Sequence, residues 1–198
     1  MTATFAPFGL RFVGNLNGSH GNEQRQYYLP NGASCPQINR GAPVKMSGGV
    51  VTSVGAAGQA PLLGVAAGFY WVDSVTKRPI QQNYIPAGTS SGGLVDGFNQ
   101  PLAFVVDSPD ALFFVQADAS VSLGDMGLNF DVTAVGGDTD TIYGTSKYAL
   151  KASSRSSVIT GAFKIVGLAR IDGNTWSDAF PVVTVKMNRS ILAEASAT

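Results

Sequence analysis

The sequence is short of charge. Only 13% of its 198 residues are charged, and 13 basic side chains balance 13 acidic ones, whereas an average soluble domain carries about 25% charged residues. Eleven of the acidic residues are Asp and only two are Glu, so the Glu and Lys that normally build exposed helix surfaces are scarce. The composition therefore argues against a helical protein, and the zero net charge argues against electrostatic binding of nucleic acid.

Histidine and cysteine are equally scarce. His20 and Cys35 are the only residues of their types, which excludes an internal disulfide and leaves no convincing Ser-His-Asp or Cys-His arrangement. A zinc site built from His and Cys is excluded by count unless subunits share ligands. We therefore expect no catalysis, no cofactor and no metal.

Long apolar runs are also missing. No stretch approaches 18 uninterrupted apolar residues, so we expect no membrane-spanning helix and no membrane partner. Residues 1–14 lack the basic start and the apolar core of a secretory signal, so we expect no leader of that kind.

The chain instead contains short apolar runs bounded by Gly, Pro, Asn and Asp. They are rich in Val, Ile, Phe and Tyr, which favour strands. The runs 102–106 and 112–117 are apolar on both faces and flank the turn-forming sequence DSPD at 107–110, which predicts a hairpin. The expected fold is all-β, a sandwich or jelly-roll-like barrel with little helix. The predicted strands are 43–52, 62–72, 79–85, 102–106, 112–117, 158–168 and 181–188.

The remaining regions have weaker strand patterns. Residues 1–42 are rich in Asn, Gly, Gln and Pro and begin with apolar residues, which predicts an extended N-terminal arm followed by a loop-rich segment. The predicted β domain spans 43–189 and contains a long loop region near 119–157. Residues 190–198 form a C-terminal tail.

Some polar motifs could carry chemistry. The sequence GTSSG at 88–92 matches the G-x-S-x-G elbow, but no helix pattern and no His follow it, so we interpret it as a flexible loop. Asp107 with Asp110, and Asp138 with Asp140, are the carboxylate pairs that a β-sandwich hydrolase would need, and the second pair could bind calcium. Because these Asp residues stand beside Pro or Gly, we interpret them as turn formers.

Three successive aromatic residues, Phe69, Tyr70 and Trp71, lie in the predicted strand 62–72. Successive strand residues point to opposite faces, so at least one ring faces away from its own core. A strand buried on both sides and a contact with another subunit or a partner are the two interpretations.

A series of strand and turn patterns runs through most of residues 4–188, least clearly at 119–157. The series comprises TFAPFGLR at 4–11, PLLGVAAGF at 61–69, RPI at 78–80, YIPAGT at 84–89, AFVVDSP at 103–109, FFVQAD at 113–118, IVGL at 165–168 and NTWSDAF at 174–180. In this order the patterns resemble tailed-bacteriophage proteins of the capsid cement or decoration type.

The resemblance implies a structural virion protein that binds the outer surface of the phage capsid lattice and reinforces it without catalysis. It implies the major capsid protein and further copies of this chain as partners, with a homotrimer favoured over a homodimer. The protein would be made in the host bacterial cytoplasm and end on the capsid exterior.

Apolar and aromatic side chains are the candidates for these contacts. An alternative function is a carbohydrate- or receptor-binding β-module of a phage tail or fibre, in which Trp71, Trp176 or Tyr84 would stack on sugars. The contact candidates are Phe5, Pro7, Phe8, Leu10, Arg11, Phe12, Phe69, Tyr70, Trp71, Trp176 and Phe180.

Overall fold

The computed structural model describes residues 4–18, 24–55, 61–92, 99–138, 142–158 and 161–192. Strands account for 45% of the structure, so the all-β prediction is confirmed. Helical structure in these residues is limited to short 3-10 turns, and no helix there is long and apolar enough to cross a membrane. The turns are Gly32–Ser34, Leu123–Asp125, Val135–Asp138 and Ala152–Ser154.

One antiparallel sheet has five strands in the order β1-β10-β15-β14-β11. Its inner face carries Phe113, Val185 and Ile165, which are fully buried, and it packs with the two-stranded sheet β12-β13. The strands are β1 (Arg11–Asn15), β10 (Ala111–Gln116), β11 (Asn129–Phe130), β12 (Val132–Ala134), β13 (Tyr148–Leu150), β14 (Phe163–Leu168) and β15 (Val182–Met187). We call this part the terminal lobe.

The second large sheet has six strands, in the order β2-β9-β6-β4-β5 with β7 also paired to β6. Phe69, Val105 and Val44 are buried on its inner side, close to the two-stranded sheet β3-β8. The strands are β2 (Gln24–Tyr28), β3 (Ile38–Asn39), β4 (Pro43–Ser47), β5 (Val50–Ser53), β6 (Gly64–Val72), β7 (Pro79–Gln82), β8 (Tyr84–Ile85) and β9 (Leu102–Val106). We call this part the middle lobe.

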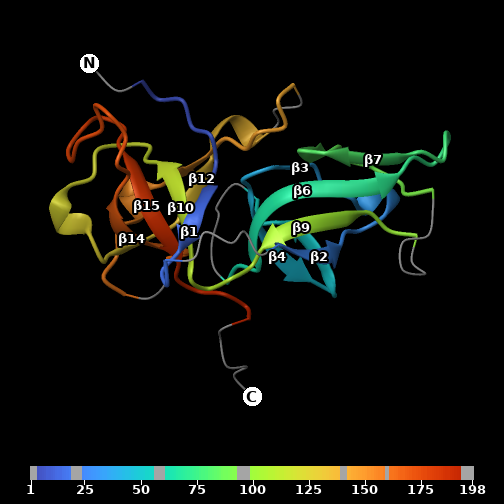
Figure 1. Ribbon diagram of the computed structural model, residues 1–198, viewed down its shortest axis with the longest axis horizontal. Coiled ribbons are helices and arrows are strands. Elements are labelled where there is room, and N and C mark those ends of the chain that lie inside the picture. The colour runs from blue at the N-terminus through green and yellow to red at the C-terminus, as the bar shows by residue number, and fades with distance from the viewer. Residues whose placement is uncertain are drawn as a thin grey trace.

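The two lobes lie side by side, so the molecule is elongated (Figure 1). The chain begins in the terminal lobe with β1, builds the whole middle lobe from β2 to β9, and returns to the terminal lobe for β10 to β15. Buried apolar residues of both lobes form one continuous core.

The predicted hairpin 102–117 is wrong. Strand β9 lies between β2 and β6, whereas β10 lies between β1 and β15, so residues 107–110 connect the two large sheets. Both strands are central in their sheets. Each already has two hydrogen-bonded neighbours, and neither has a free edge for the other.

Other boundaries differ from the predictions as well. Predicted strand 43–52 is the hairpin β4-β5, because Gly48 and Gly49 adopt positive φ angles of 59° and 82° that turn the chain. Predicted strand 79–85 is divided between β7 and β8. The region 119–157, predicted as a long loop, contains β11, β12 and β13.

The N-terminal residues 1–42 also differ from the predicted arm. They supply β1 to the terminal lobe and both β2 and β3 to the middle lobe. Among the described residues before β1, only 4–10 run outside a strand. Strand propensity is low in β2, whose sequence is QRQYY, so its pairing with the apolar strand β9 decides its structure.

Backbone hydrogen bonds fasten the lobes together. Between the lobes, the Leu10 amide donates to the Gly41 carbonyl (2.9 Å), and within the middle lobe the Gly41 amide donates to the Ala66 carbonyl (2.7 Å). Nearby, the Ser146 amide donates to the Arg40 carbonyl, and the Tyr148 hydroxyl donates to the Gly55 carbonyl (2.6 Å). We call the Leu10–Gly41–Ala66 contact the interlobe joint.

Candidate functional site

The start of the N-terminal segment contacts its own chain. The Ala6 amide donates to Gln116 Oε1 (2.9 Å), and Gln116 Nε2 donates to the carbonyls of Thr4 (3.0 Å) and Phe180 (3.2 Å). The rings of Phe5 and Phe180 lie 5.0 Å apart between centroids. Two candidate contact residues therefore pack against each other within one chain, over the Gln116 end of β10.

The rest of the segment leads into the interlobe joint. Leu10 is 3% exposed, and the Phe12 ring meets the Phe113 ring edge-on at 6.1 Å, so both belong to the core. Arg11 is exposed, and its guanidinium lies 4.4 Å from the centroid of the Phe8 ring. Pro7 is half-buried.

The aromatic strand β6 has one outward ring. Phe69 is fully buried and Trp71 is only 6% exposed, while Tyr70 between them is half-buried on the opposite face. This alternation is what strand geometry requires. Trp71 therefore cannot serve as a sugar-stacking platform in this conformation, because its ring is enclosed in the core.

The outward face of the middle-lobe sheet carries a row of side chains across four strands. Cross-strand pairing aligns Tyr28 of β2, Leu102 of β9, Tyr70 of β6 and Gln81 of β7. Phe104 lies on the same face two residues along β9 and is half-buried. Aromatic rings therefore lie on the side of the sheet opposite to Phe69.

The outward face of the terminal-lobe sheet is mixed: Leu112 and Phe114 are apolar, and their cross-strand partners Lys186 and Arg11 are charged. Leu112, Phe114 and Thr184 alternate with the buried residues of β10 and β15 and are half-buried. Beside them is an open groove of about 650 Å³ that Trp176 lines. Its other apolar lining residues are Leu16, Leu112, Leu123, Met126, Val166, Leu168 and Ala169.

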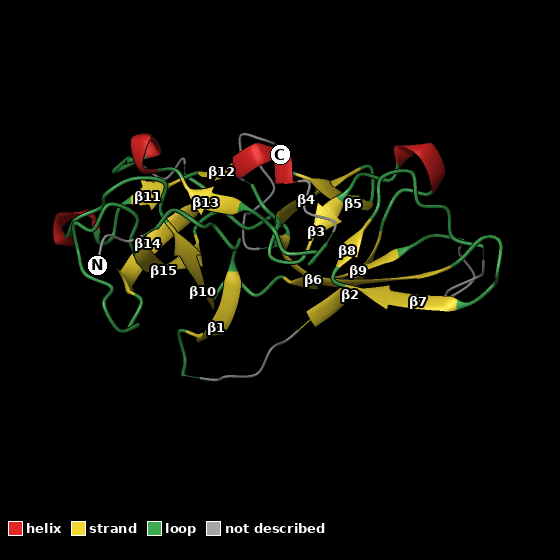
Figure 2. Cartoon of the chain, turned by 90° about the horizontal axis from the view of Figure 1, so that it is seen from above, coloured by secondary structure: helices red, strands yellow, loops and turns green. Residues whose placement is uncertain are grey.

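Both outward faces lie on the same side of the molecule. Seen from above, β1, β10 and β15 of one lobe and β2, β7 and β9 of the other follow one side, with β11–β13 and β3–β5 on the other (Figure 2). We call the two outward faces together the open sheet faces. Their half-buried apolar side chains include Leu112, Phe114, Tyr70 and Phe104.

The predicted carboxylate pairs have different surroundings. Asp107 is 3% exposed and accepts a hydrogen bond from the Tyr27 hydroxyl (2.5 Å), with Arg25 Nη1 at 3.4 Å. Asp110 is exposed. Burial, together with the bond to Asp107, raises the pKa of Tyr27 to about 12. Asp107 thus joins β2 to the interlobe connection.

In the described residues, the other polar motifs make hydrogen bonds within the chain. Asp138 Oδ1 accepts a hydrogen bond from the Lys147 amide (2.6 Å), whereas Asp140 lies outside the described residues, as does His20. Residues 88–92 contain no helix, and the Thr89 carbonyl accepts a bond from the Gly32 amide. No cluster of three or more His, Cys, Asp or Glu that could hold a metal occurs in the described part of the chain.

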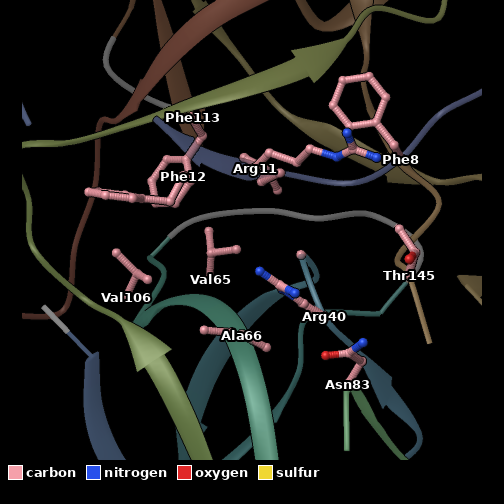
Figure 3. A pocket seen from close by; sticks show the side chains of 13 residues that line it. Phe8, Arg11, Phe12, Arg40, Val65, Ala66, Asn83, Val106, Phe113 and Thr145 are labelled. Atoms are coloured by element: carbon pink, nitrogen blue, oxygen red, sulfur yellow. The ribbon is translucent and has the colours of Figure 1, made fainter. Parts of the chain in front are cut away.

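A cleft of about 400 Å³ opens between the lobes (Figure 3). Arg11, Phe12 and Phe113 line it from the terminal lobe, and Arg40 and Val65 line it from the middle lobe. The sequence does not suggest this cleft, because Arg11 and Arg40 both lie in the predicted arm and loop-rich segment 1–42 and no spacing pattern relates them.

No protein-family model matches the sequence, and neither a curated protein nor a solved structure matches it significantly.

Proposed function

We propose that this protein is a capsid cement or decoration protein of a tailed bacteriophage. It binds the outer surface of the capsid lattice, reinforces the shell and performs no catalysis. The observation that carries the proposal is the pair of open sheet faces on one side of an elongated, charge-poor molecule.

The chemistry of these faces suits a protein partner. Phe114 and Leu112 in one lobe, and Tyr70 and Phe104 in the other, are half-buried without a covering sheet. Exposed apolar patches rimmed by polar residues mark interaction sites, and aromatic residues are enriched in the cores of protein interfaces. A low charge content lowers the desolvation cost of covering such a surface.

The partners follow from the same proposal. The major capsid protein is the surface that is covered, and copies of this chain associate with one another, as a homotrimer in preference to a homodimer. A lattice presents many identical sites, so modest affinity at each site gives stable decoration when linked copies bind together. The protein is made in the bacterial cytoplasm and acts on the capsid exterior.

Capsid binding tests the proposal directly. Capsids of the parent phage, prepared without this protein, are mixed with purified protein and sedimented, and the temperature of capsid rupture is measured. Wild-type protein should co-sediment and raise that temperature. Phe114→Lys should bind at least about tenfold more weakly, since a charge would replace a central aromatic contact. Val75→Lys is the control, because Val75 is 86% exposed in the loop between β6 and β7.

Two results would refute the proposal. One is a wild-type protein that stays in the supernatant at every concentration. The other is a folded Phe114→Lys protein that decorates as well as the Val75→Lys control.

A receptor- or carbohydrate-binding module of a phage tail or fibre is the second candidate. The observation that favours it is the row containing Tyr28 and Tyr70 on an open sheet, because flat aromatic faces stack on sugar rings. Glycan-array binding that is lost in Tyr70→Ala, together with no capsid binding, would select this function.

A further inference from the structure

The interlobe cleft is a cavity that borders the open sheet faces, since Arg11 in its lining is the cross-strand partner of Phe114. Its floor is the interlobe joint, where Leu10, Gly41 and Ala66 are linked by backbone hydrogen bonds of 2.9 and 2.7 Å. A volume of about 400 Å³ lies within the range of small-molecule sites. The joint fixes the shape of the cleft before any ligand arrives.

Two arginines give the cleft positive charge. Arg11 lies on the terminal-lobe wall with its guanidinium over Phe8, and Arg40 lies on the opposite wall at the end of β3 (Figure 3). No carboxylate among the residues that the structure describes forms an ion pair with either. Elsewhere in these residues Arg25 and Arg155 have carboxylate partners, so the cleft holds cations that an anion would complement.

The rest of the lining is both polar and apolar. Eight of the thirteen lining residues are aliphatic or aromatic, of which Phe8, Phe12 and Ala67 are only partly buried, and Asn83 and Thr145 are the neutral polar ones. Such walls favour a ligand with an apolar body behind one charged group. A bare phosphate could also pair with the two guanidinium groups, but it has no apolar part to contact the walls.

We propose that the interlobe cleft binds a carboxylate attached to an apolar group, with Arg11 and Arg40 holding the carboxylate and the partly buried Phe8, Phe12 and Ala67 contacting the apolar part. Planar guanidinium groups match the two oxygens of a carboxylate. The carboxylate comes either from a small organic acid or from an acidic residue beside an apolar one in a peptide.

Calorimetry with the full chain tests the proposal whether or not the protein binds capsids. The probe is 3-phenylpropionate, and 3-phenylpropionamide is its uncharged counterpart. We expect the acid to bind at least tenfold more tightly than the amide. Arg40→Gln and Arg11→Gln should each weaken binding of the acid by about tenfold, the effect of losing a charge-assisted hydrogen bond. Arg78→Gln, a change at an exposed arginine after the β6–β7 loop, should leave binding unchanged.

The outcomes separate clearly, provided that each variant melts at the wild-type temperature. Equal binding of acid and amide, unchanged binding in Arg40→Gln, or equal binding of inorganic phosphate would overturn the proposal. A capped Phe-Asp-Phe peptide that binds more tightly than 3-phenylpropionate would identify a peptide carboxylate as the ligand. A free acid that binds more tightly would identify a small molecule.

Discussion

Gly9 shows how a single residue controls the approach of the two lobes. It adopts φ of +73°, and a Cβ atom there would lie 2.7 Å from Ser146 Cβ and 2.9 Å from the Gly41 carbonyl oxygen. Left-handed backbone is unfavourable for residues with a side chain, and a contact below 3.0 Å forces the neighbour to move. The interlobe joint therefore depends on a glycine for two separate reasons.

A pair of alanine substitutions separates those reasons. Gly88 has nearly the same φ of +76°, but nothing lies within 4 Å of its hypothetical Cβ. Gly88→Ala should lower the free energy of unfolding by about 1–2 kcal/mol, the cost of the left-handed conformation. Gly9→Ala should cost about 1–3 kcal/mol more, because it also overpacks the joint. Urea denaturation measures both values, and equal losses would show that the close approach at Gly9 is not maintained.

The raised pKa of Tyr27 predicts that the free energy of unfolding falls at alkaline pH. Its pKa is raised from 10.0 to about 12, first by burial and then by the hydrogen bond and charge of Asp107. The folded state holds the hydroxyl proton more tightly than the unfolded state. This contribution is complete below pH 10 and is lost as pH rises from 10 to about 12. Burial likewise raises the pKa of Tyr148 to about 12.

The measurement is unfolding free energy against pH for wild type and Tyr27→Phe. Wild type should lose stability between pH 10 and 12, and the variant should lose less, with Tyr148 responsible for the remainder. At pH 7 the variant should be less stable by about 1–3 kcal/mol, because a buried oxygen of Asp107 loses a donor. Parallel curves from pH 9 to 12 would contradict this account.

Among the elements, the segment 4–10 before β1 depends on one side chain. Gln116 is 6% exposed and bonds to Ala6, Thr4 and Phe180 at once. Gln116→Ala should release this segment, since its hydrogen bonds to the β10 end are lost. Hydrogen exchange should accelerate in 4–10 and remain slow in β10, with a stability loss of about 1–3 kcal/mol. Gln81→Ala, at an exposed residue of β7, is the control.

Deletion of residues 1–7 tests the same contacts without disturbing β1. It removes Phe5 and the Gln116 contacts but leaves β1 intact, whereas a deletion of 1–14 also removes most of an edge strand. A normal exchange pattern in 4–10 of Gln116→Ala would mean that Phe5 and Phe180 hold the segment without the glutamine.

The strands show how much of the fold the sequence could predict. The strands with strong apolar patterns, β9, β10 and β15, lie within one residue of their predicted limits. Their partners were not predictable, because an apolar run on both faces indicates that both faces are buried without identifying the neighbouring strands. Residues 107–110 predict a hairpin because they form a turn between two consecutive apolar runs, and that pattern does not distinguish a hairpin from a connection between sheets.

The candidate site was predictable only in part. Strand alternation required an outward ring among Phe69, Tyr70 and Trp71, and the structure identifies it as Tyr70. Phe5 before β1 and Phe12 within it are candidates for contacts with other proteins, and within this chain they lie against Phe180 and Phe113. The interlobe cleft needs two lobes in contact, a tertiary feature that no local pattern of Arg11 or Arg40 contains.

For the whole molecule, the proposed function implies that copies of this chain associate through apolar contacts at the open sheet faces. Such association should change little when salt screens charges, and sulfate should strengthen it because that ion is excluded from protein surfaces. Analytical ultracentrifugation should therefore find the same oligomer in low salt and in about 1 M NaCl, where the Debye length is only about 3 Å.

The Tyr70→Lys variant links this prediction to a particular surface. In the wild type, the Tyr70 ring lies on the outward face of β6, opposite the buried Phe69. Replacing it with lysine should therefore dissociate the oligomer without lowering the melting temperature. Lys45→Gln changes the charge by one unit at an exposed residue of β4 and should have no effect. An oligomer that dissociates in NaCl, or that survives Tyr70→Lys, would mean that ionic contacts away from the aromatic row hold the subunits together. The scarcity of charge would then have to be explained without an interface at the open sheet faces.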